Sequence, residues 1–133
     1  MEEIKEAMEI LKNSQTFAVV GATVNEEKYG YKIFKALKEA NYKVFPINPR
    51  YESIFETRCF PSLRQLAEKP DVVVTVIPPE ATLKVIEECH ELAIPVVWMP
   101  PGSWSEEAVH KARGYGLKVI YDRCLIFTLK MLD

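Results

Sequence analysis

The chain has 133 residues, of which 48% are hydrophobic and 27% charged, amounts that are ordinary for one globular domain. Its 17 basic and 19 acidic residues give a net charge of −2 without a basic stripe, which argues against a nucleic-acid partner. The apolar runs are only strand-sized and the first ten residues are acidic, so we expect neither a membrane span nor a signal peptide. Cys59, Cys89 and Cys124 lack C-x-x-C spacing, which favours a reduced cytoplasmic protein over a disulfide or zinc scaffold.

The first half of the chain alternates helical and strand patterns. Ile4, Met8 and Leu11 recur with the spacing of a short amphipathic helix. The apolar run 16–21 closes on glycine and reads as a buried strand, followed by a helical stripe through 30–40. Residues 43–48 predict a second strand that ends at proline. A looser stretch over 50–62 and a brief helix around 62–67 follow.

The second half continues the same alternation. Residues 71–77, "DVVVTVI", form a continuous β-branched run that predicts a strand buried on both faces. Pro79 and Glu80 suit the first turn of the next helix. Strands are predicted at 95–99 and 117–121. The spacing of Ser103 and Glu106 predicts a capping box at the start of a helix between these two strands. Residues 125–132 form a short closing segment.

This alternation predicts an α/β fold of the Rossmann-like, doubly wound type, in which helices cover both faces of a five-stranded parallel sheet. Right-handed crossovers favour strand order 3-2-1-4-5, counted along the chain. The whole of 1–133 is expected to form one domain. Ligands of such sheets bind beyond the carboxyl ends of the strands, where the strand order reverses.

The turn after the first predicted strand carries one glycine, Gly21, where a dinucleotide fingerprint has three. One glycine permits close approach of the backbone, and amide groups at a helix start attract phosphate oxygens. Thr23 can add a hydroxyl and Lys28 a positive charge. A branched side chain at Gly21 is therefore expected to abolish ligand binding while the fold stays native.

The end of the second strand bears on which nucleotide fits. NAD-binding proteins place a carboxylate there to hold the ribose hydroxyls, whereas this chain has Asn48, Pro49 and Arg50. A guanidinium without a carboxylate suits an additional ribose phosphate. This pattern excludes plain NAD but does not by itself select among phosphorylated alternatives.

An ordered series of segments resembles the small stand-alone CoA-binding proteins, whose fold is similar to the CoA-binding domain of the succinyl-CoA synthetase α subunit. The segments are "VVGAT", "YKVFPINPRYESI", "CFPSL", "DVVVTVIPPE", "VVWMPPGSWSEEA" and "GLKVIYDRC", which span Thr16 to Cys124. The resemblance implies that the Gly21 turn holds the CoA phosphates, flanked by Asn48 to Arg50. It further implies that Ile77 to Pro79 line the adenine side and that Pro100 to Ser103 face the pantetheine arm. The expected CoA contacts are Gly21, Ala22, Thr23, Lys28, Tyr29, Gly30, Asn48, Pro49, Arg50, Ile77, Pro78, Pro79, Pro100, Pro101, Gly102, Ser103 and Arg123.

Three positions depart from the family pattern. Glu56 replaces a glycine in the loop after the second strand, and Val76-Ile77 replaces a Phe-Arg pair. Pro100 stands where the family has glutamine in its W-M-Q-x-G segment. These differences weaken the expected side-chain contacts on the adenine side and at the fourth strand.

Catalysis requires a nucleophile, an acid/base pair or a metal near the ligand. His90 and His110 both fall within predicted helices, and no His/Cys/Asp cluster has metal-ligand spacing. The favoured function is therefore a non-catalytic carrier or sensor that binds CoA or acyl-CoA, with a protein partner left open. An NADP-dependent oxidoreductase or orphaned NADP domain is one alternative. A thiol redox module using Cys124, beside Arg123, is the other.

Overall fold

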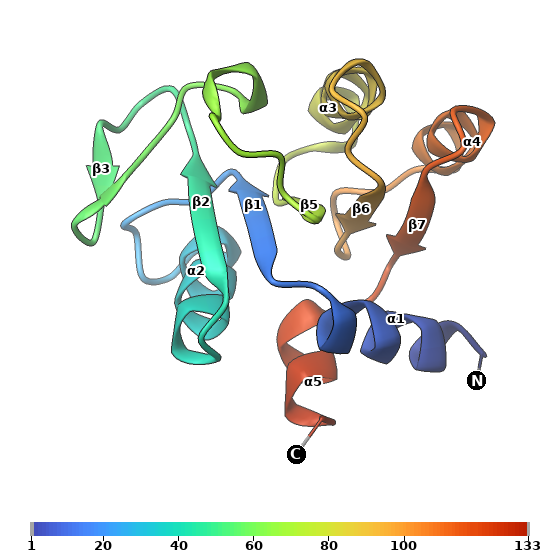
Figure 1. The fold of residues 1–133 in the computed structure, drawn as a ribbon, viewed down its shortest axis with the longest axis horizontal. Coiled ribbons are helices and arrows are strands. Elements are labelled where there is room, and N and C mark those ends of the chain that lie inside the picture. Colours follow the sequence, from blue (N-terminus) through green and yellow to red (C-terminus); the bar gives the residue numbers. More distant parts are fainter. Residues whose placement is uncertain (1, 133) are drawn as a thin grey trace.

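The computed structural model describes residues 2–132. Its central element is a five-stranded parallel sheet between two layers of helices (Figure 1). The strands of this sheet are β1 (Thr16–Val20), β2 (Lys43–Ile47), β5 (Val72–Thr75), β6 (Val96–Met99) and β7 (Lys118–Tyr121). The expected doubly wound α/β fold is confirmed.

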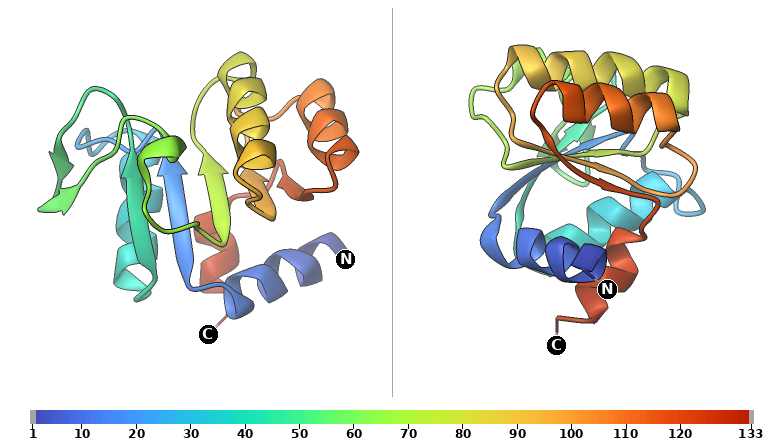
Figure 2. Two further views of the ribbon diagram at one scale, coloured as in Figure 1. Left: turned by 45° about the horizontal axis from the view of Figure 1, so that its top comes forward. Right: turned by 90° about the vertical axis from the view of Figure 1, so that its right-hand side faces the viewer.

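Helices cover both faces of the sheet, which Figure 2 shows from the side. One layer contains α1 (Glu2–Asn13), α2 (Tyr29–Glu39) and α5 (Leu125–Lys130). The other contains α3 (Pro79–Glu91) and α4 (Glu106–Gly114). No helix within residues 2–132 is long and apolar enough to cross a membrane.

The core follows from alternation along the strands. Phe17 and Val19 of β1 pack with α1 and α2, whereas Ala18 between them packs on the opposite face with Val85 and Cys89 of α3. All four residues of β5 are buried, as the continuous β-branched run predicts.

The strand order is β2-β1-β5-β6-β7, which is 2-1-3-4-5 along the chain, so the predicted order 3-2-1-4-5 is wrong. That order would have paired β5 with the outer side of β2. Pro46 of β2 has no N–H, and its carbonyl points to that outer side, where it accepts the Phe60 amide at 3.0 Å. A proline there suits an edge strand, and β5 pairs with β1 instead.

The looser stretch after β2 contains a small hairpin that the sequence did not predict. It pairs β3 (Ser53–Ile54) with β4 (Thr57–Arg58) through Phe55 and Glu56, whose φ angles are +49° and +64°. A two-residue turn with two positive φ angles usually carries Asn-Gly, so this pair gave no recognisable turn pattern. The predicted brief helix is a 3-10 turn, Leu63–Gln65.

The predicted start of α4 is also wrong. Ser105 is the N-cap, and its hydroxyl accepts the Ala108 amide at 3.0 Å, which is the standard role of a serine at this position. Ser103 instead points into the protein. The S-x-x-E spacing of Ser103 and Glu106 was therefore coincidental.

Candidate functional site at the carboxyl ends of the strands

Gly21 lies where three neighbouring strands end together. Its φ is +98°, its amide donates to the Ile47 carbonyl at 2.9 Å, and a Cβ at this position would lie 2.2 Å from the Val76 carbonyl oxygen. Only glycine fits this turn without moving the backbone of β5. Gly21 therefore shapes the fold itself, and we no longer expect its replacement by a branched residue to leave the fold native.

A second glycine, Gly30, completes the turn nine residues later. It is buried in the first turn of α2, and a Cβ there would lie 2.1 Å from the carbonyl oxygen of Gly21. The absence of side chains at both positions lets the start of α2 press against the end of β1. This contact brings the first amide groups of the helix, near Tyr29, to the Gly21 turn, the arrangement that favours phosphate oxygens.

Asn48 connects the ends of β1 and β2. Its side-chain amide donates to the Ala22 carbonyl at 2.9 Å, and its side-chain oxygen accepts the Arg50 amide at 2.9 Å. Both ends of the Asn48 side chain are thus occupied within the protein. Asn48 positions the turn on which Pro49 and Arg50 stand exposed.

The loop between β1 and α2 is held by hydroxyl groups. Thr23 Oγ1 lies 2.9 Å from the Tyr51 hydroxyl and accepts the Asn25 amide at 3.2 Å. Beyond it, Lys28 is exposed at the N-cap of α2. Among residues 2–132, neither Lys28 nor Arg50 takes part in an ion pair. Two cations without ion-pair partners among these residues thus lie on the loops that follow β1 and β2, the two strands whose ends meet at Gly21.

The end of β5 packs directly against this turn. Ile77 Cγ2 would lie 3.2 Å from a Cβ at Gly21, and the half-buried Pro79 opens α3 after the exposed N-cap Pro78. Glu80 occupies the first turn of α3. Because a carboxylate already offsets the positive end of this helix, the start of α2 is the better place for an anion.

The end of β6 contributes little exposed surface. Pro100 is buried, and the buried Ser103 hydroxyl lies 2.6 Å from Thr75 Oγ1 and 3.5 Å from Thr82 Oγ1. The exposed part of this segment is Pro101 with Gly102, whose φ is +91°. Any contact of this segment with a ligand thus falls on these two residues.

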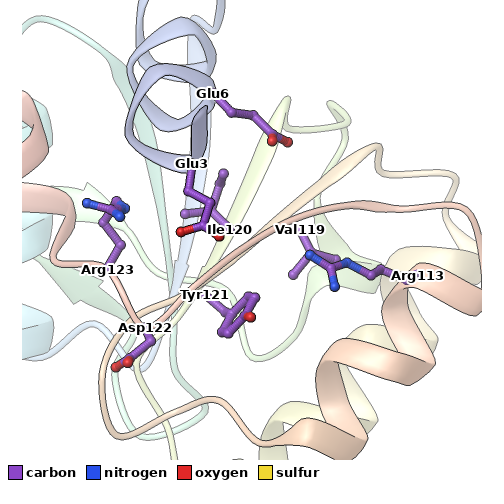
Figure 3. A pocket seen from close by; sticks show the side chains of 8 residues that line it. All are labelled: Glu3, Glu6, Arg113, Val119, Ile120, Tyr121, Asp122 and Arg123. Carbon is purple, nitrogen blue, oxygen red and sulfur yellow. The ribbon is translucent and has the colours of Figure 1, made fainter. Parts of the chain in front are cut away.

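The residues that follow β7 divide between two places. The Tyr29 hydroxyl donates to Cys124 Sγ at 3.1 Å, which brings Cys124 to the start of α2. Burial, and next the hydrogen bond to Cys124, raises the pKa of Tyr29 above its ordinary value. Arg123 lines a hollow beside β7, at the opposite edge of the sheet from β2, together with Glu3 and Glu6 of α1 (Figure 3).

The other titratable candidates lie elsewhere. His90 and His110 are exposed on α3 and α4, and the His90 ring stacks on Tyr115 with ring centroids 4.0 Å apart. Burial raises the pKa of the Cys89 thiol to about 12. Within residues 2–132, no group of His, Cys, Asp and Glu could hold a metal ion.

The sequence predicted the Gly21 turn but missed how it is built. Gly30 stood among the expected ligand contacts, whereas its structural role is to admit the Gly21 carbonyl. Tyr51, the partner of Thr23, was not singled out at all. Neither role has a fixed spacing in the sequence that could have revealed it, because each depends on a loop of irregular shape.

Known proteins match nearly the whole chain. The chain is 32% identical over 119 residues to an ADP-forming acetate–CoA ligase of Methanocaldococcus jannaschii, but spans only 17% of that protein's length. It is 31% identical to the uncharacterized protein YneT of Bacillus subtilis, covering 90% of this chain and 89% of YneT. A solved hypothetical protein of Pyrococcus horikoshii superposes with a TM-score of 0.92 at 30% identity, covering 97% of this chain and 91% of that one. The CoA binding domain family matches residues 15–130, and the chain therefore belongs to that family.

Proposed function

We propose that this protein binds CoA or an acyl-CoA at the Gly21 turn and acts as a non-catalytic carrier or sensor. In this proposal the chain forms one domain and works in the cytoplasm. The observation that carries this proposal is the junction of Gly21 and Gly30, which brings the start of α2 against the end of β1. Membership of the CoA binding domain family identifies CoA as the ligand to test first. Three free cysteines are in keeping with a reducing compartment.

In this proposal the phosphates lie on the amides at the start of α2, and Lys28 and Arg50 neutralise their charge. Pro49 and Ile77 to Pro79 border the adenine, and Pro101 with Gly102 borders the pantetheine arm. The ribose 3′-phosphate of CoA is assigned to Arg50, because its guanidinium is exposed and has no ion-pair partner among residues 2–132. A planar guanidinium binds a phosphate through two parallel hydrogen bonds.

Calorimetric titration at fixed salt tests this assignment. Replacing Arg50 with alanine is expected to weaken CoA binding by about ten- to a hundredfold, corresponding to about 1.5–3 kcal/mol for a charge-assisted pair. The same replacement should spare dephospho-CoA, which lacks the 3′-phosphate. Arg58→Ala is the matched control, because Arg58 is also exposed but stacks on Phe60, 4.8 Å from the ring centroid.

The wild-type protein should bind CoA most tightly, then dephospho-CoA, then NADP and NAD. Tighter binding of NADP than of CoA would replace the proposal with the oxidoreductase alternative. Equal weakening of both CoA forms by Arg50→Ala would show that Arg50 contributes general positive charge rather than recognition of one phosphate.

A further inference from the structure

The two edge strands of the sheet, β2 and β7, differ in whether another segment covers their outer side. Near the carboxyl end of β2, Phe60 covers the outer side of the strand: its amide donates to Pro46 O at 3.0 Å and its carbonyl accepts the Asn48 amide at 2.9 Å. At the other edge, β7 pairs with β6 alone among the strands in residues 2–132. Natural proteins protect sheet edges because unpaired strands associate with other chains. The unsealed edge of β7 therefore requires an explanation.

The backbone groups on this open side can be identified. The amides of Lys118 and Asp122 donate to Pro95 O and Met99 O, both at 2.9 Å, so the even-numbered residues face β6. Because successive residues of a strand face opposite sides, Val119 and Tyr121 direct their N–H and C=O groups to the open edge. Four hydrogen-bonding groups are thus presented in the spacing of a strand.

A groove runs along these groups. It has a volume of about 310 Å³ and is lined by five consecutive residues, 119–123, with Glu3 and Glu6 of α1 on one wall and Arg113 of α4 on the other (Figure 3). A second hollow, of about 330 Å³, shares Tyr121 and Arg113 and adds Trp104, whose ring centroid lies 5.0 Å from that of Tyr121. Tryptophan, tyrosine and arginine are the side chains that most often anchor protein interfaces.

We propose that this groove binds a second copy of the chain, with the two β7 strands antiparallel and Ile120 on the two-fold axis. In this register Val119 of each copy lies opposite Tyr121 of the other, and all four outward backbone groups find partners. The two sheets then form one continuous sheet of ten strands. The interface is isologous, since the same strand serves both copies.

The charges at the ends of β7 favour this occupant and this direction. Lys118 begins the strand and Asp122 follows it; both are exposed, and neither takes part in an ion pair within residues 2–132. An antiparallel second copy places Lys118 of each chain beside Asp122 of the other, twice per dimer. A parallel copy would instead place like charges together, which is unfavourable between neighbouring strands.

Sedimentation equilibrium over a range of concentrations tests the proposal. The wild type should reach the mass of two chains at high concentration. Lys118→Asp and Asp122→Lys should each weaken dimerisation on the order of tenfold or more, because each turns two attractive contacts into repulsive ones. The double variant Lys118→Asp/Asp122→Lys should restore the wild-type dissociation constant. Lys35→Glu, an exposed change on α2, is the control and should have no effect.

Amide hydrogen exchange provides a second readout within the wild type. The Val119 and Tyr121 amides should become protected as the concentration rises, whereas the Ile120 amide, which faces β6, should be protected at every concentration. A wild type that stays monomeric at about millimolar concentration overturns the proposal. The open edge of β7 would then be a binding site for a different protein. A dimer whose dissociation constant is unchanged by both charge reversals overturns the proposal as well, because its interface must then lie elsewhere.

Discussion

At Gly30, the absence of a Cβ determines how closely α2 can approach the end of β1. A Cβ at Gly30 would lie 2.1 Å from a backbone oxygen that cannot move aside without moving the Gly21 turn. We expect Gly30→Ala to lower the free energy of unfolding by about 1–3 kcal/mol, the usual cost of overpacking. The variant should also lose CoA affinity, because the start of α2 is pushed away from the end of β1.

Gly114→Ala provides the comparison. Gly114 is the last residue of α4, and nothing lies within 4 Å of a Cβ built there. Alanine should therefore be neutral or stabilise the protein by about 0.5–1 kcal/mol, because glycine is the poorer helix former. Urea unfolding of both variants, monitored by circular dichroism, measures the difference. Equal stability of the two variants would show that α2 adjusts freely against β1.

At the scale of the elements, Asp71 ties the beginning of β5 to the beginning of β1. Its carboxylate accepts the amides of Gln15 at 2.8 Å and Thr16 at 3.1 Å. The hydrogen bond from Gln15, assisted by those from Thr16, holds the pKa of Asp71 below its ordinary value despite partial burial. Because the pKa is lower in the folded state, the contribution to stability is present above the unfolded pKa, about 3.9, and is lost as the pH falls through the folded value.

Replacing Asp71 with asparagine should expose this dependence. At pH 7 the variant is expected to be about 0.5–1 kcal/mol less stable than the wild type, a modest figure because Asp71 is partly exposed and its charge is screened. The difference should shrink below about pH 4 as the wild-type carboxylate becomes protonated. Urea titrations at a series of pH values measure it. A gap that stays constant down to pH 2 would mean that packing, not charge, explains the loss.

The elements also show what the sequence could predict. The five main strands follow from short continuous apolar runs, and the longer helices from helically spaced apolar residues and from turn residues at their ends, all of which are local properties. Strand order is not local, because it depends on which strands pair across a crossover. Pro46 did carry information about it, since proline within a strand favours an edge. The hairpin was missed because Phe55 and Glu56 are not residues typical of a turn with positive φ angles, and the cap at Ser105 was missed because Ser103 has the spacing of a capping box with Glu106.

For the candidate site, the sequence predicted the position but not the hydrogen bonds of its side chains. The strand ends that meet at Gly21 could be placed from sequence because the carboxyl ends of parallel strands share one edge. Which side chains stay available there could not. The Asn48 side-chain amide donates to the Ala22 carbonyl, and the Ser103 hydroxyl lies 2.6 Å from Thr75 Oγ1. Both contacts join residues far apart in the sequence, so no local pattern reveals them.

For the molecule as a whole, we expect CoA esters to be bound without being consumed. Cys124 contacts the side chain of Tyr29, the first residue of α2, whose hydroxyl donates to its sulfur. Incubation with a panel of acyl-CoA esters should release free thiol no faster than in the absence of protein. The assay uses a thiol reagent on aliquots from which the protein has been removed. Hydrolysis that disappears in Cys124→Ala would overturn the carrier proposal in favour of thiol chemistry.

The covered end of β2 has a consequence for how many copies of the chain the proposed pairing could join. A sheet with two free edges can add copies without end and so form fibres, whereas a sheet with one free edge is finished after a single addition. Pro46 supplies no outward donor, and Phe60 already occupies the groups beside it. In the proposed dimer, addition of a further strand at β2 would therefore be disfavoured near Pro46.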